Sequence, residues 1–265
     1  LKPGTDVAVA NGILNVIIRE GLIDNDFIAA HTNDWEAARA AVEKFTPDVA
    51  SQISGVPAER IVAAGQLYGR AKTGMIMHAR GIEHHSNGVD NVLSYINIVL
   101  ATGKIGSAGR GYGTITGQGN GQGGREMGQK ADQLPGQRSI SDPEHRKYIC
   151  DVWGISDDEL PEAGVSVVEM FDKMREGEVK GFISLCNNGM VSLPDVNSIR
   201  QSLEGLEFNV NIDFLMSEAS RYADVILPGT SWAEDEGVVA SAEARVIKIN
   251  KAIEPIGDSR TDWWI

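Results

Sequence analysis

A glycine-dense run from Gly103 to Gly128 divides this chain of 265 residues into two parts of different character. The residues before it predict a helix-rich α/β unit, and the residues after it predict a second α/β unit. Glycine lacks a Cβ, so it reaches backbone conformations closed to other residues and lets the main chain approach a ligand closely. The Thr, Asn and Gln residues between the glycines supply neutral hydrogen-bond donors and acceptors. The run is therefore either a flexible linker or a loop that grips a large polar ligand.

The composition is that of an acidic globular protein. The chain has 24 Lys and Arg against 37 Asp and Glu, which gives a formal net charge of −13. This charge argues against nucleic acid as a partner, although a local basic site for an anionic ligand stays open. No apolar run reaches the length of a membrane span, so we expect no membrane segment. The lack of a signal peptide or targeting motif leads us to expect a cytoplasmic protein.

Cys150 and Cys186 are the only cysteines, and they lie far apart in the sequence. They form neither a disulfide framework nor a Cys-x-x-Cys metal motif. We expect each of them to be a small, partly buried residue. The sequence therefore predicts no metal ligand within this chain.

In the first half, an apolar run at residues 73–79 predicts a buried strand, and a periodic apolar pattern from about residue 87 to Gly103 predicts a helix. Arg80, Gly81 and His84 fall between the two. Ligands of open α/β sheets bind beyond the carboxyl ends of strands, where loops lead into helices. These residues are therefore candidates for a site, although the adjacent histidines His84 and His85, taken alone, fit a solvated turn better.

In the second half, predicted strands at residues 181–186, 208–213 and 223–228 alternate with helices. This alternation predicts a parallel sheet. The loops that follow the three strands then converge on one edge of it. Residues 238–250 predict a β-hairpin or an extended segment.

Four stretches together resemble the molybdopterin oxidoreductases of the dimethyl sulfoxide reductase family. They are residues 101–106 (Ala-Thr-Gly-Lys-Ile-Gly), 116–118 (Thr-Gly-Gln), 222–237 and 260–263 (Arg-Thr-Asp-Trp), in the family's order. Members of this family hold molybdenum or tungsten between two molybdopterin guanine dinucleotides. The resemblance implies an α/β fold with parts of two doubly wound, mostly parallel-sheet, Rossmann-like cofactor domains. Residues 1–118 would be the later part of the first cofactor-binding domain, and residues 119–265 the second, ending in an extended β segment.

The resemblance also assigns candidate cofactor contacts. Those expected near the pterins are Arg80, Gly81, His84 and Gln118. Those expected around the guanine nucleotides are Asn187, Asn188, Ser192, Asp213, Ser217, Asp224 and Asp262. A carboxylate such as Asp262 can accept two hydrogen bonds, from the N1–H and the amino group of guanine. Taken alone, Asp213 and Asp262 fit helix caps equally well, and Asp224 fits a surface carboxylate.

The parts that complete a redox centre in this family lie outside this chain. The family's iron–sulfur cysteine cluster, where present, and the residue that ligates the metal both lie upstream. Neither Cys150 nor Cys186 takes the ligand position. We therefore expect a central fragment, inactive alone, of a molybdopterin-dependent oxidoreductase that works with an electron-transfer partner.

Two readings without redox chemistry stay open. The parent protein could have kept the fold and lost the metal, as in some respiratory-complex subunits. A plain nucleotide-binding module is less well supported, because such modules place Gly-x-Gly-x-x-Gly directly after a strand. Here the position of the third glycine is Gln122, and no strand is expected directly before Gly117.

The residue before Gly117 bears on the substrate, which we expect to be a small anion. Formate dehydrogenases of this family carry an Arg there, which steers formate, whereas this chain has Thr116. Thr116 cannot act as a cationic clamp, but Arg125 can serve nearby. We therefore predict a nitrate reductase, which transfers an oxygen atom from nitrate to the reduced metal and releases nitrite. Formate dehydrogenase, oxidising formate to carbon dioxide, is the alternative, because residues 250–262 resemble both enzymes.

Overall fold

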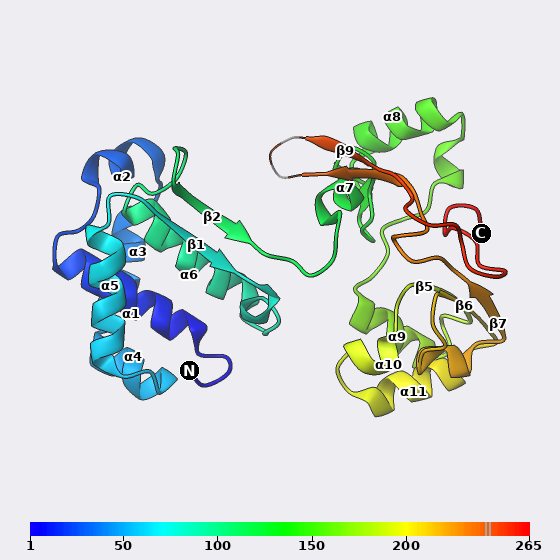
Figure 1. Ribbon diagram of the computed structural model, residues 1–265, viewed down its shortest axis with the longest axis horizontal. Helices are drawn as coiled ribbons and strands as arrows, with labels where there is room; N and C mark the ends of the chain where they lie inside the picture. The colour runs from blue at the N-terminus through cyan, green and yellow to red at the C-terminus, as the bar shows by residue number, and fades with distance from the viewer. Residues whose placement is uncertain (242, 244) are drawn as a thin grey trace. The chain divides into compact units, whose positions relative to one another are not determined.

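The computed structural model describes residues 1–241, 243 and 245–265. These residues divide into two compact units, Leu1–Gly117 and Gln118–Ile265 (Figure 1). The boundary expected from the sequence, after residue 118, is adjacent to this division. That the two units are the cofactor domains stays a prediction. Among the described residues, no helix is both long and apolar enough to cross a membrane.

The first unit is built from helices around one pair of parallel strands. Its elements are α1 (Asp6–Arg19), α2 (Asn25–His31), α3 (Trp35–Glu43), α4 (Pro47–Ser54), α5 (Ala58–Arg70), β1 (Gly74–His78), the short helix η1 (Arg80–Ile82), α6 (Gly88–Ala101) and β2 (Arg110–Thr114). Helix α6 confirms the helix predicted between about residue 87 and Gly103. The Asp24 and Thr46 side chains accept hydrogen bonds from backbone amides in the first turns of α2 and α4.

Helix α1 carries the core of this unit. Its Leu14 and Ile17 are fully buried and pack with Ile98 of α6. Helix α5 crosses α1 closely at Gly65, which has no side chain. A Cβ at this position would lie only 2.8 Å from the Cβ of Val16, so a larger residue would push the two helices apart. Burial of these apolar side chains is the main source of stability for the unit.

Lys104 closes the carboxyl end of helix α5. The residue is only 3% exposed, and its ammonium group donates to the main-chain oxygens of Tyr68 and Gly69. A cation there satisfies carbonyls that have no partner within the helix and complements the helix dipole. Burial, followed by the nearby charge of Arg110, lowers the pKa of Lys104. Lys104 lies in one of the stretches that carry the family resemblance, so this stretch has a structural role in the unit.

Strand β1 forms where the sequence predicts it, but the prediction that it is buried was wrong. Met75 and Met77 are 54% and 57% exposed, whereas Ile76 packs against the core. On the exposed face, Met75 and Met77 lie opposite Gly111 and Gly113 of β2. These glycines add no side chains that could cover the methionines.

Strand β2 lies inside the glycine-dense run and was not predicted. Its sequence, Arg-Gly-Tyr-Gly-Thr, has glycine where an apolar pattern would show a strand. Parallel pairing with β1 stabilises it. Ile115 and Thr116 separate the end of β2 from Gly117, so a strand lies close to this glycine but not directly before it. The loop still does not match the dinucleotide-binding motif, because Gln122 stands where that motif has its third glycine.

The second unit contains a parallel sheet and a separate hairpin. Its elements are α7 (Gly121–Glu126), β3 (Gln133–Leu134), β4 (Arg138–Ser139), α8 (Pro143–Trp153), the short helix η2 (Asp157–Glu159), α9 (Val167–Arg175), β5 (Gly181–Leu185), α10 (Gly189–Ser192), α11 (Val196–Glu204), β6 (Phe208–Asp213), the short helix η3 (Ala219–Tyr222), β7 (Val225–Pro228), β8 (Gly237–Ala240) and β9 (Val246–Ile249). Strands β5, β6 and β7 pair in parallel in that order. The α/β class with small parallel sheets is confirmed.

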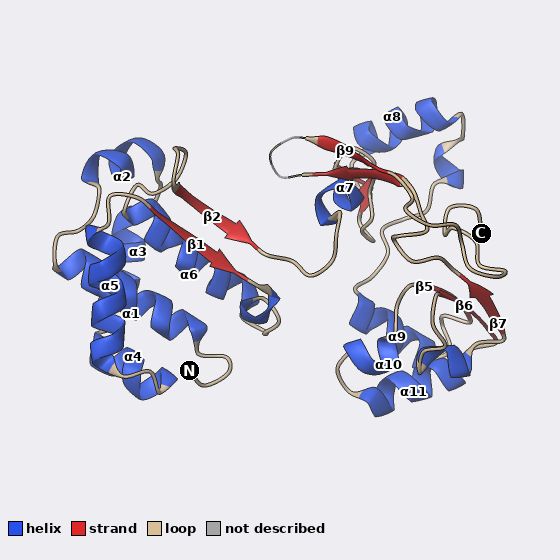
Figure 2. Cartoon of the chain, viewed as in Figure 1, coloured by secondary structure: helices blue, strands red, loops and turns tan. Residues whose placement is uncertain are grey.

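Helices α9, α10 and α11 lie on one side of the β5–β6–β7 sheet (Figure 2). The core on this side consists of Phe171 and Met174 from α9 and Ile199 and Leu203 from α11, with Phe182 of β5 packed against them. On the other face, Ile183 and Leu185 are 69% and 51% exposed. The sheet is therefore covered by helices on one face in this structure.

Strands β8 and β9 pair antiparallel, as the predicted hairpin requires. Ala242 and Ala244, which fall in the predicted segment, lie outside the described residues. Asn120 joins this hairpin to α7, because its Nδ2 donates to Val238 O at 3.2 Å and its Oδ1 accepts from Ala240 N at 3.0 Å. Asn120 has a φ of 59°, a left-handed conformation that asparagine tolerates. The glycine-dense run is therefore partly a helix fixed to a hairpin.

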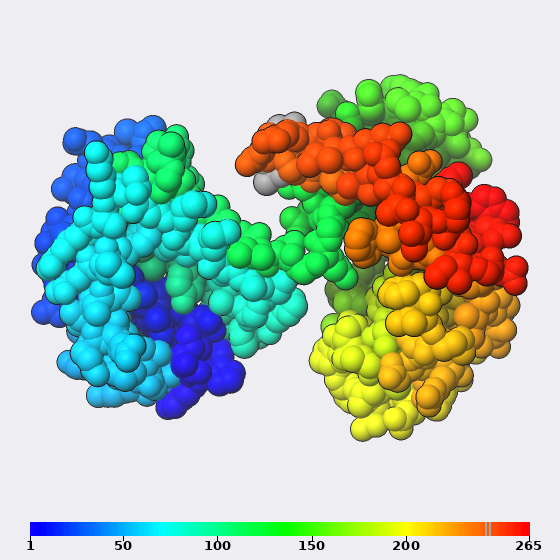
Figure 3. All heavy atoms as spheres, in the orientation of Figure 1, coloured from blue at the N-terminus to red at the C-terminus, as the bar shows by residue number. Residues whose placement is uncertain are grey.

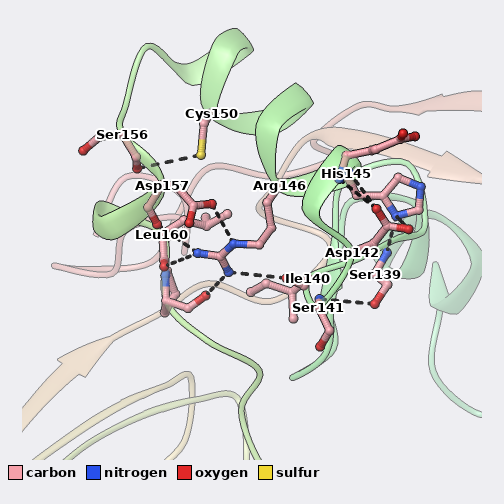
Figure 4. Close-up of polar contacts among 12 residues, drawn as sticks. Ser139, Ile140, Ser141, Asp142, His145, Arg146, Cys150, Ser156, Asp157 and Leu160 are labelled. Atoms are coloured by element: carbon pink, nitrogen blue, oxygen red, sulfur yellow. Dashed lines mark hydrogen bonds and ion pairs between the residues drawn. The ribbon is translucent and has the colours of Figure 1, made fainter.

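Arg146 ties together the segment between β3 and α9 (Figure 4). The residue is 7% exposed, and its Nε donates to Asp157 Oδ1 at 2.8 Å. Its other guanidinium nitrogens donate to four main-chain oxygens, those of Ile140, Asp157, Leu160 and Pro161. The hydrogen bond to Asp157 is the main cause that raises the pKa of Arg146. A single buried guanidinium thus satisfies carbonyls in a segment with little regular structure.

The placement of Leu14 can be tested by truncation. Replacing Leu14 by alanine leaves a cavity in the core, so the free energy of unfolding should fall by about 3–5 kcal/mol. Leu67 of α5 is the matched control, because it is 77% exposed and its replacement by alanine should cost less than about 0.5 kcal/mol. Urea unfolding followed by circular dichroism measures both. Equal losses for the two variants would contradict the described core.

Candidate functional site

Parallel pairing brings three loops of the second unit to one edge of the β5–β6–β7 sheet. The register places Leu185 opposite Ile212, Ile212 opposite Leu227, and Asp213 opposite Pro228. The three strands therefore end side by side, and the loops that begin at Cys186, Phe214 and Gly229 lie together. This edge, at the carboxyl ends of parallel strands, is where open α/β sheets bind ligands.

The C-terminal segment brings Asp262 to the same edge. The backbone amide of Arg260 donates to Pro228 O at 3.0 Å, which joins this segment to the end of β7. The Cys186 thiol donates to Asp262 Oδ2 with a sulfur–oxygen distance of 3.4 Å. A Cβ at Gly229 would lie 2.9 Å from Asp262 Oδ1, so only glycine leaves room for the carboxylate. Asp262 is therefore built into the edge rather than free at its surface.

The second oxygen of this carboxylate, Oδ1, is buried and has no hydrogen-bond partner within the described part of the chain. A buried carboxylate oxygen without a donor is costly, so it calls for a donor from a ligand or from water. The guanine edge presents N1–H and amino donors, which are the groups that such an oxygen accepts. The residues present thus fit the guanine end of the expected cofactor.

The electrostatics of the edge keep Cys186 protonated. Burial, then the charge of Asp262 and the hydrogen bond to it, and last the charge of Asp213, raise the pKa of the Cys186 thiol to about 11. The neutral thiol can therefore serve as a donor to Asp262 near neutral pH. Sequence reasoning missed this role, because Cys186 and Asp262 are 76 positions apart and no local pattern links them.

Asn188 joins the loop after β5 to the loop after β6. Its Nδ2 donates to Glu218 Oε2 at 2.7 Å, and its Oδ1 accepts from the amide of Ala219 at 3.3 Å. The first of these bonds is the main cause that lowers the pKa of Glu218. Ser192 Oγ donates to Asn188 O at 3.0 Å. The structure therefore gathers Asn188 and Ser192 beside the exposed Asn187.

Ser217 and Asp213 make local contacts in the loop after β6. The hydroxyls of Ser217 and Ser220 lie 2.9 Å apart. Asp213 Oδ1 accepts from the amides of Phe214 and Leu215 at 2.8 and 3.4 Å. Asp213 thus caps the loop that follows it. This local role is similar to the helix cap that the sequence left open as an alternative for Asp213. Both residues nevertheless lie at the edge that carries Asp262.

Asp224 lies at the opposite edge of the sheet. It directly precedes β7, so it stands at the amino end of that strand. Its Oδ2 accepts from the backbone amide of Asn209 at 2.7 Å, and its own amide donates to Asn209 O at 2.8 Å. These bonds align the start of β7 with β6. The structure therefore does not bring Asp224 together with the other predicted nucleotide contacts.

In the first unit, Arg80 and Gly81 lie in η1, directly beyond β1. Arg80 Nη1 is 2.9 Å from Glu83 Oε2, and a Cβ added at Gly81 would have nothing within 4 Å. The ion pair orients the Arg80 guanidinium, and Gly81 faces open space. His84 follows in the same loop and is exposed. These three predicted residues therefore lie together at the carboxyl end of β1.

His78 and Thr114 complete this loop region, and sequence reasoning missed both. They end β1 and β2 and face each other in the register. His78 Nε2 lies 3.1 Å from Thr114 Oγ1, and His78 Nδ1 lies 3.7 Å from Glu83 Oε1. A signal was present for His78, which is the polar residue next to the end of the strand predicted at residues 73–79. Its partner could not be found, because β2 itself was not predicted.

Thr116, Gln118 and Arg125 are exposed residues of the glycine-dense run. Thr116 follows β2 in the first unit, whereas Gln118 and Arg125 belong to the second unit, with Arg125 on α7. Their roles at a pterin and at the substrate stay predictions. Over residues 1–241, 243 and 245–265, no group of three or more His, Cys, Asp or Glu side chains is placed to hold a metal ion.

The contact between Cys186 and Asp262 predicts a change in thiol reactivity. Replacing Asp262 by asparagine keeps the size of the side chain and removes its charge. The pKa of Cys186 should then fall from about 11, although burial, the largest cause, keeps it above its ordinary value. Since the thiolate is the nucleophile, alkylation at mildly alkaline pH should become about three- to tenfold faster.

Alkylation with iodoacetamide followed by peptide mass spectrometry measures this rate. Cys150 on α8 is the internal control, and its rate should not change. An unchanged rate at Cys186 would show that Asp262 does not act on the thiol.

Comparisons with known proteins reveal relatives along the whole chain. Residues 1–265 match the family described as molybdopterin oxidoreductase. Over 267 residues the chain is 47% identical to the assimilatory nitrate reductase catalytic subunit of Bacillus subtilis (strain 168), covering 100% of this chain and 37% of that protein. Over 265 residues it is 38% identical to the F420-dependent formate dehydrogenase 1 subunit alpha of Methanococcus maripaludis, covering 100% of this chain and 39% of that protein.

A solved structure shares the fold. Acetylene hydratase from Pelobacter acetylenicus matches with a TM-score of 0.72 and 19% sequence identity, covering 98% of this chain and 38% of that one. At this identity the match shows the fold alone. The chain spans 37% and 39% of the length of the two curated relatives named above.

Proposed function

The chain belongs to the molybdopterin oxidoreductase family, and from this premise we propose that the full-length protein is a nitrate reductase. It binds two molybdopterin guanine dinucleotides and molybdenum or tungsten, and it reduces nitrate to nitrite. The identity of 47% to an assimilatory nitrate reductase, against 38% to a formate dehydrogenase, supports this substrate. Thr116, in the place where the formate enzymes of the family carry Arg, supports the same choice.

The buried, unpaired oxygen of Asp262 is the observation that carries the cofactor part of this proposal. Asp262 accepts hydrogen bonds from the guanine edge, while the Cys186 thiol holds its other oxygen. Asn187, Asn188, Ser192 and Ser217 flank the nucleotide from the loops after β5 and β6. The metal and the pterins supply the redox chemistry when bound.

The remaining candidate residues bind and orient the cofactor and the substrate. Arg80, held by Glu83 at 2.9 Å, supplies a cation near the pterin in the first unit, next to Gly81 and His84. Gln118, in the second unit, offers its side-chain amide to a pterin. Arg125 supplies positive charge for nitrate, and Thr116 lines its path without adding charge. An electron-transfer partner reduces the proposed enzyme, and its cytoplasmic location stays a prediction.

Formate dehydrogenase is the second candidate function. The identity of 38% to a formate dehydrogenase subunit over the whole chain supports it. In that case the full-length protein would oxidise formate to carbon dioxide, and the bound metal and pterins would supply the redox chemistry. A scaffold that has lost its metal is the non-catalytic alternative, and metal content separates it from both enzymes.

The proposal is tested on the purified full-length protein. Metal analysis should find molybdenum or tungsten, and nucleotide released by acid should amount to about two guanines per chain. With a reduced viologen dye as electron donor, the protein should convert nitrate to nitrite. Formate oxidation without nitrate reduction would replace the first candidate by the second, and absence of both metal and guanine would reject the proposal.

The role of Asp262 is tested by its replacement with alanine in the same protein. The loss of a buried hydrogen-bonded partner should weaken retention of the guanine nucleotide by about 1–3 kcal/mol. Asp224→Ala is the matched control, because Asp224 is also a carboxylate of this sheet but lies at the opposite edge. Guanine content after mild heating is measured for both. Equal retention in the Asp262 and Asp224 variants would contradict the assignment.

A further inference from the structure

The side of β8 that faces away from β9 is bonded to the side chain of Asn120. In an antiparallel pair, the backbone groups of successive residues point alternately toward the partner strand and away from it. Ser241 N donates to Arg245 O across the hairpin at 2.8 Å. Ser241 therefore faces the partner strand, whereas Val238 and Ala240 face outward. The Asn120 amide bonds to both outward residues, donating to Val238 O at 3.2 Å and accepting from Ala240 N at 3.0 Å.

This contact takes the place of the role that asparagine usually has at the start of a helix. Asn120 is the N-cap residue of α7, and an N-cap asparagine normally accepts from an amide of the first helical turn. Within residues 118–241, all of which are described, the Asn120 side chain makes no such bond. A Cβ at Gly123 would lie 2.2 Å from Asn120 Oδ1, so glycine there leaves room for the side chain to reach β8. Both residues are thus needed for the contact with the hairpin.

Helix α7 has little stability of its own. Three of its six residues are glycine, which is a weak helix former, and helices this short are marginal in water. Its position therefore depends on contacts at its two ends. At the carboxyl end, Gly136 N donates to Glu126 O at 2.6 Å. At the amino end, the two hydrogen bonds of Asn120 join the helix to β8.

We propose that Asn120 is a positioning residue, which holds the amino end of α7 against β8 and thereby fixes the place of Arg125 on that helix. Arg125 is exposed and is the candidate that supplies positive charge for nitrate. A cation that is already held in place binds a small anion better than a mobile one, because less conformational freedom is lost on binding. The role of Asn120 in holding α7 rests on the contacts alone, and only the ligand of Arg125 rests on the proposed function.

Hydrogen exchange of single amides in the full-length protein tests the hold on α7. Asn120→Gly removes the side chain, and glycine adopts the φ of 59° at this position without strain. Exchange should become about tenfold faster at the Ala240 amide, which donates to Asn120 Oδ1, and at the Gly124 amide, which donates to Asn120 O in the first turn of α7. The Ser241 amide, bonded across the hairpin, should not change. Unchanged exchange at Ala240 and Gly124 would overturn the proposal.

Two further variants sharpen this experiment. Gln137→Gly is the matched control, because Gln137 also has a positive φ, of 57°, but is exposed in the turn between β3 and β4. It should leave exchange at Ala240 unchanged. Gly123→Ala keeps Asn120 but places a methyl group against its Oδ1, so exchange at Ala240 should again become faster, although alanine favours the helix. Slower or unchanged exchange at Ala240 in Gly123→Ala would contradict the proposed contact.

A double-mutant cycle tests the step from Asn120 to Arg125. With nitrate as substrate, Asn120→Gly should raise KM about three- to tenfold and leave kcat unchanged, because a cation that only binds the substrate contributes equally to the ground state and the transition state. In a protein that already carries Arg125→Ala, the same substitution should leave KM unchanged. Additive effects on KM would show that Asn120 does not act through Arg125. Absence of nitrate reduction in the unmodified protein would reject the proposed function instead, and the exchange experiment would still decide whether Asn120 holds α7.

Discussion

Parallel pairing of β5, β6 and β7 is the constraint on which the candidate nucleotide site depends. Parallel strands end at the same edge, so three loops that are distant in sequence begin side by side there. The hydrogen bond from Arg260 N to Pro228 O then fixes the C-terminal segment beside β7 and delivers Asp262 to this edge. Without the sheet, Asp262 would be one of many acidic residues. With it, Asp262 becomes a carboxylate held by Cys186 and closed in by Gly229.

The second unit places polar groups inside, where parallel sheets are usually apolar. Asn209 and Asn211 face the helices from β6, and Arg146 lies buried among main-chain carbonyls. Each of these side chains forms hydrogen bonds with a segment that has few backbone hydrogen bonds within itself. Buried polar networks fix one arrangement, because any other arrangement leaves donors or acceptors unpaired. Such interiors suit a unit whose irregular loops must be held in place.

Local signals explain what could be predicted from the sequence. The periodic apolar pattern of α6 and the apolar runs of β5, β6 and β7 predicted a helix, three parallel strands and the converging loops. Strand β2 was missed because its pattern is interrupted by glycine and its stability comes from β1. The bond from Cys186 to Asp262 joins positions with no pattern between them. Asp224 was assigned by resemblance alone, although the strand predicted at residues 223–228 already placed it at the amino end of that strand.

The charge at this edge bears on which end of a nucleotide it can hold. Asp213, Glu218 and Asp262 are all carboxylates, and a phosphate beside them would be repelled. The guanine edge, which presents only donors at N1 and its amino group, is attracted instead. In the proposed complex the base therefore lies against Asp262, and the phosphates lie away from the carboxylates, near neutral groups such as Asn187. In the proposed complex the acidic residues contact the base, and this arrangement would let a chain with a net charge of −13 bind an anionic cofactor.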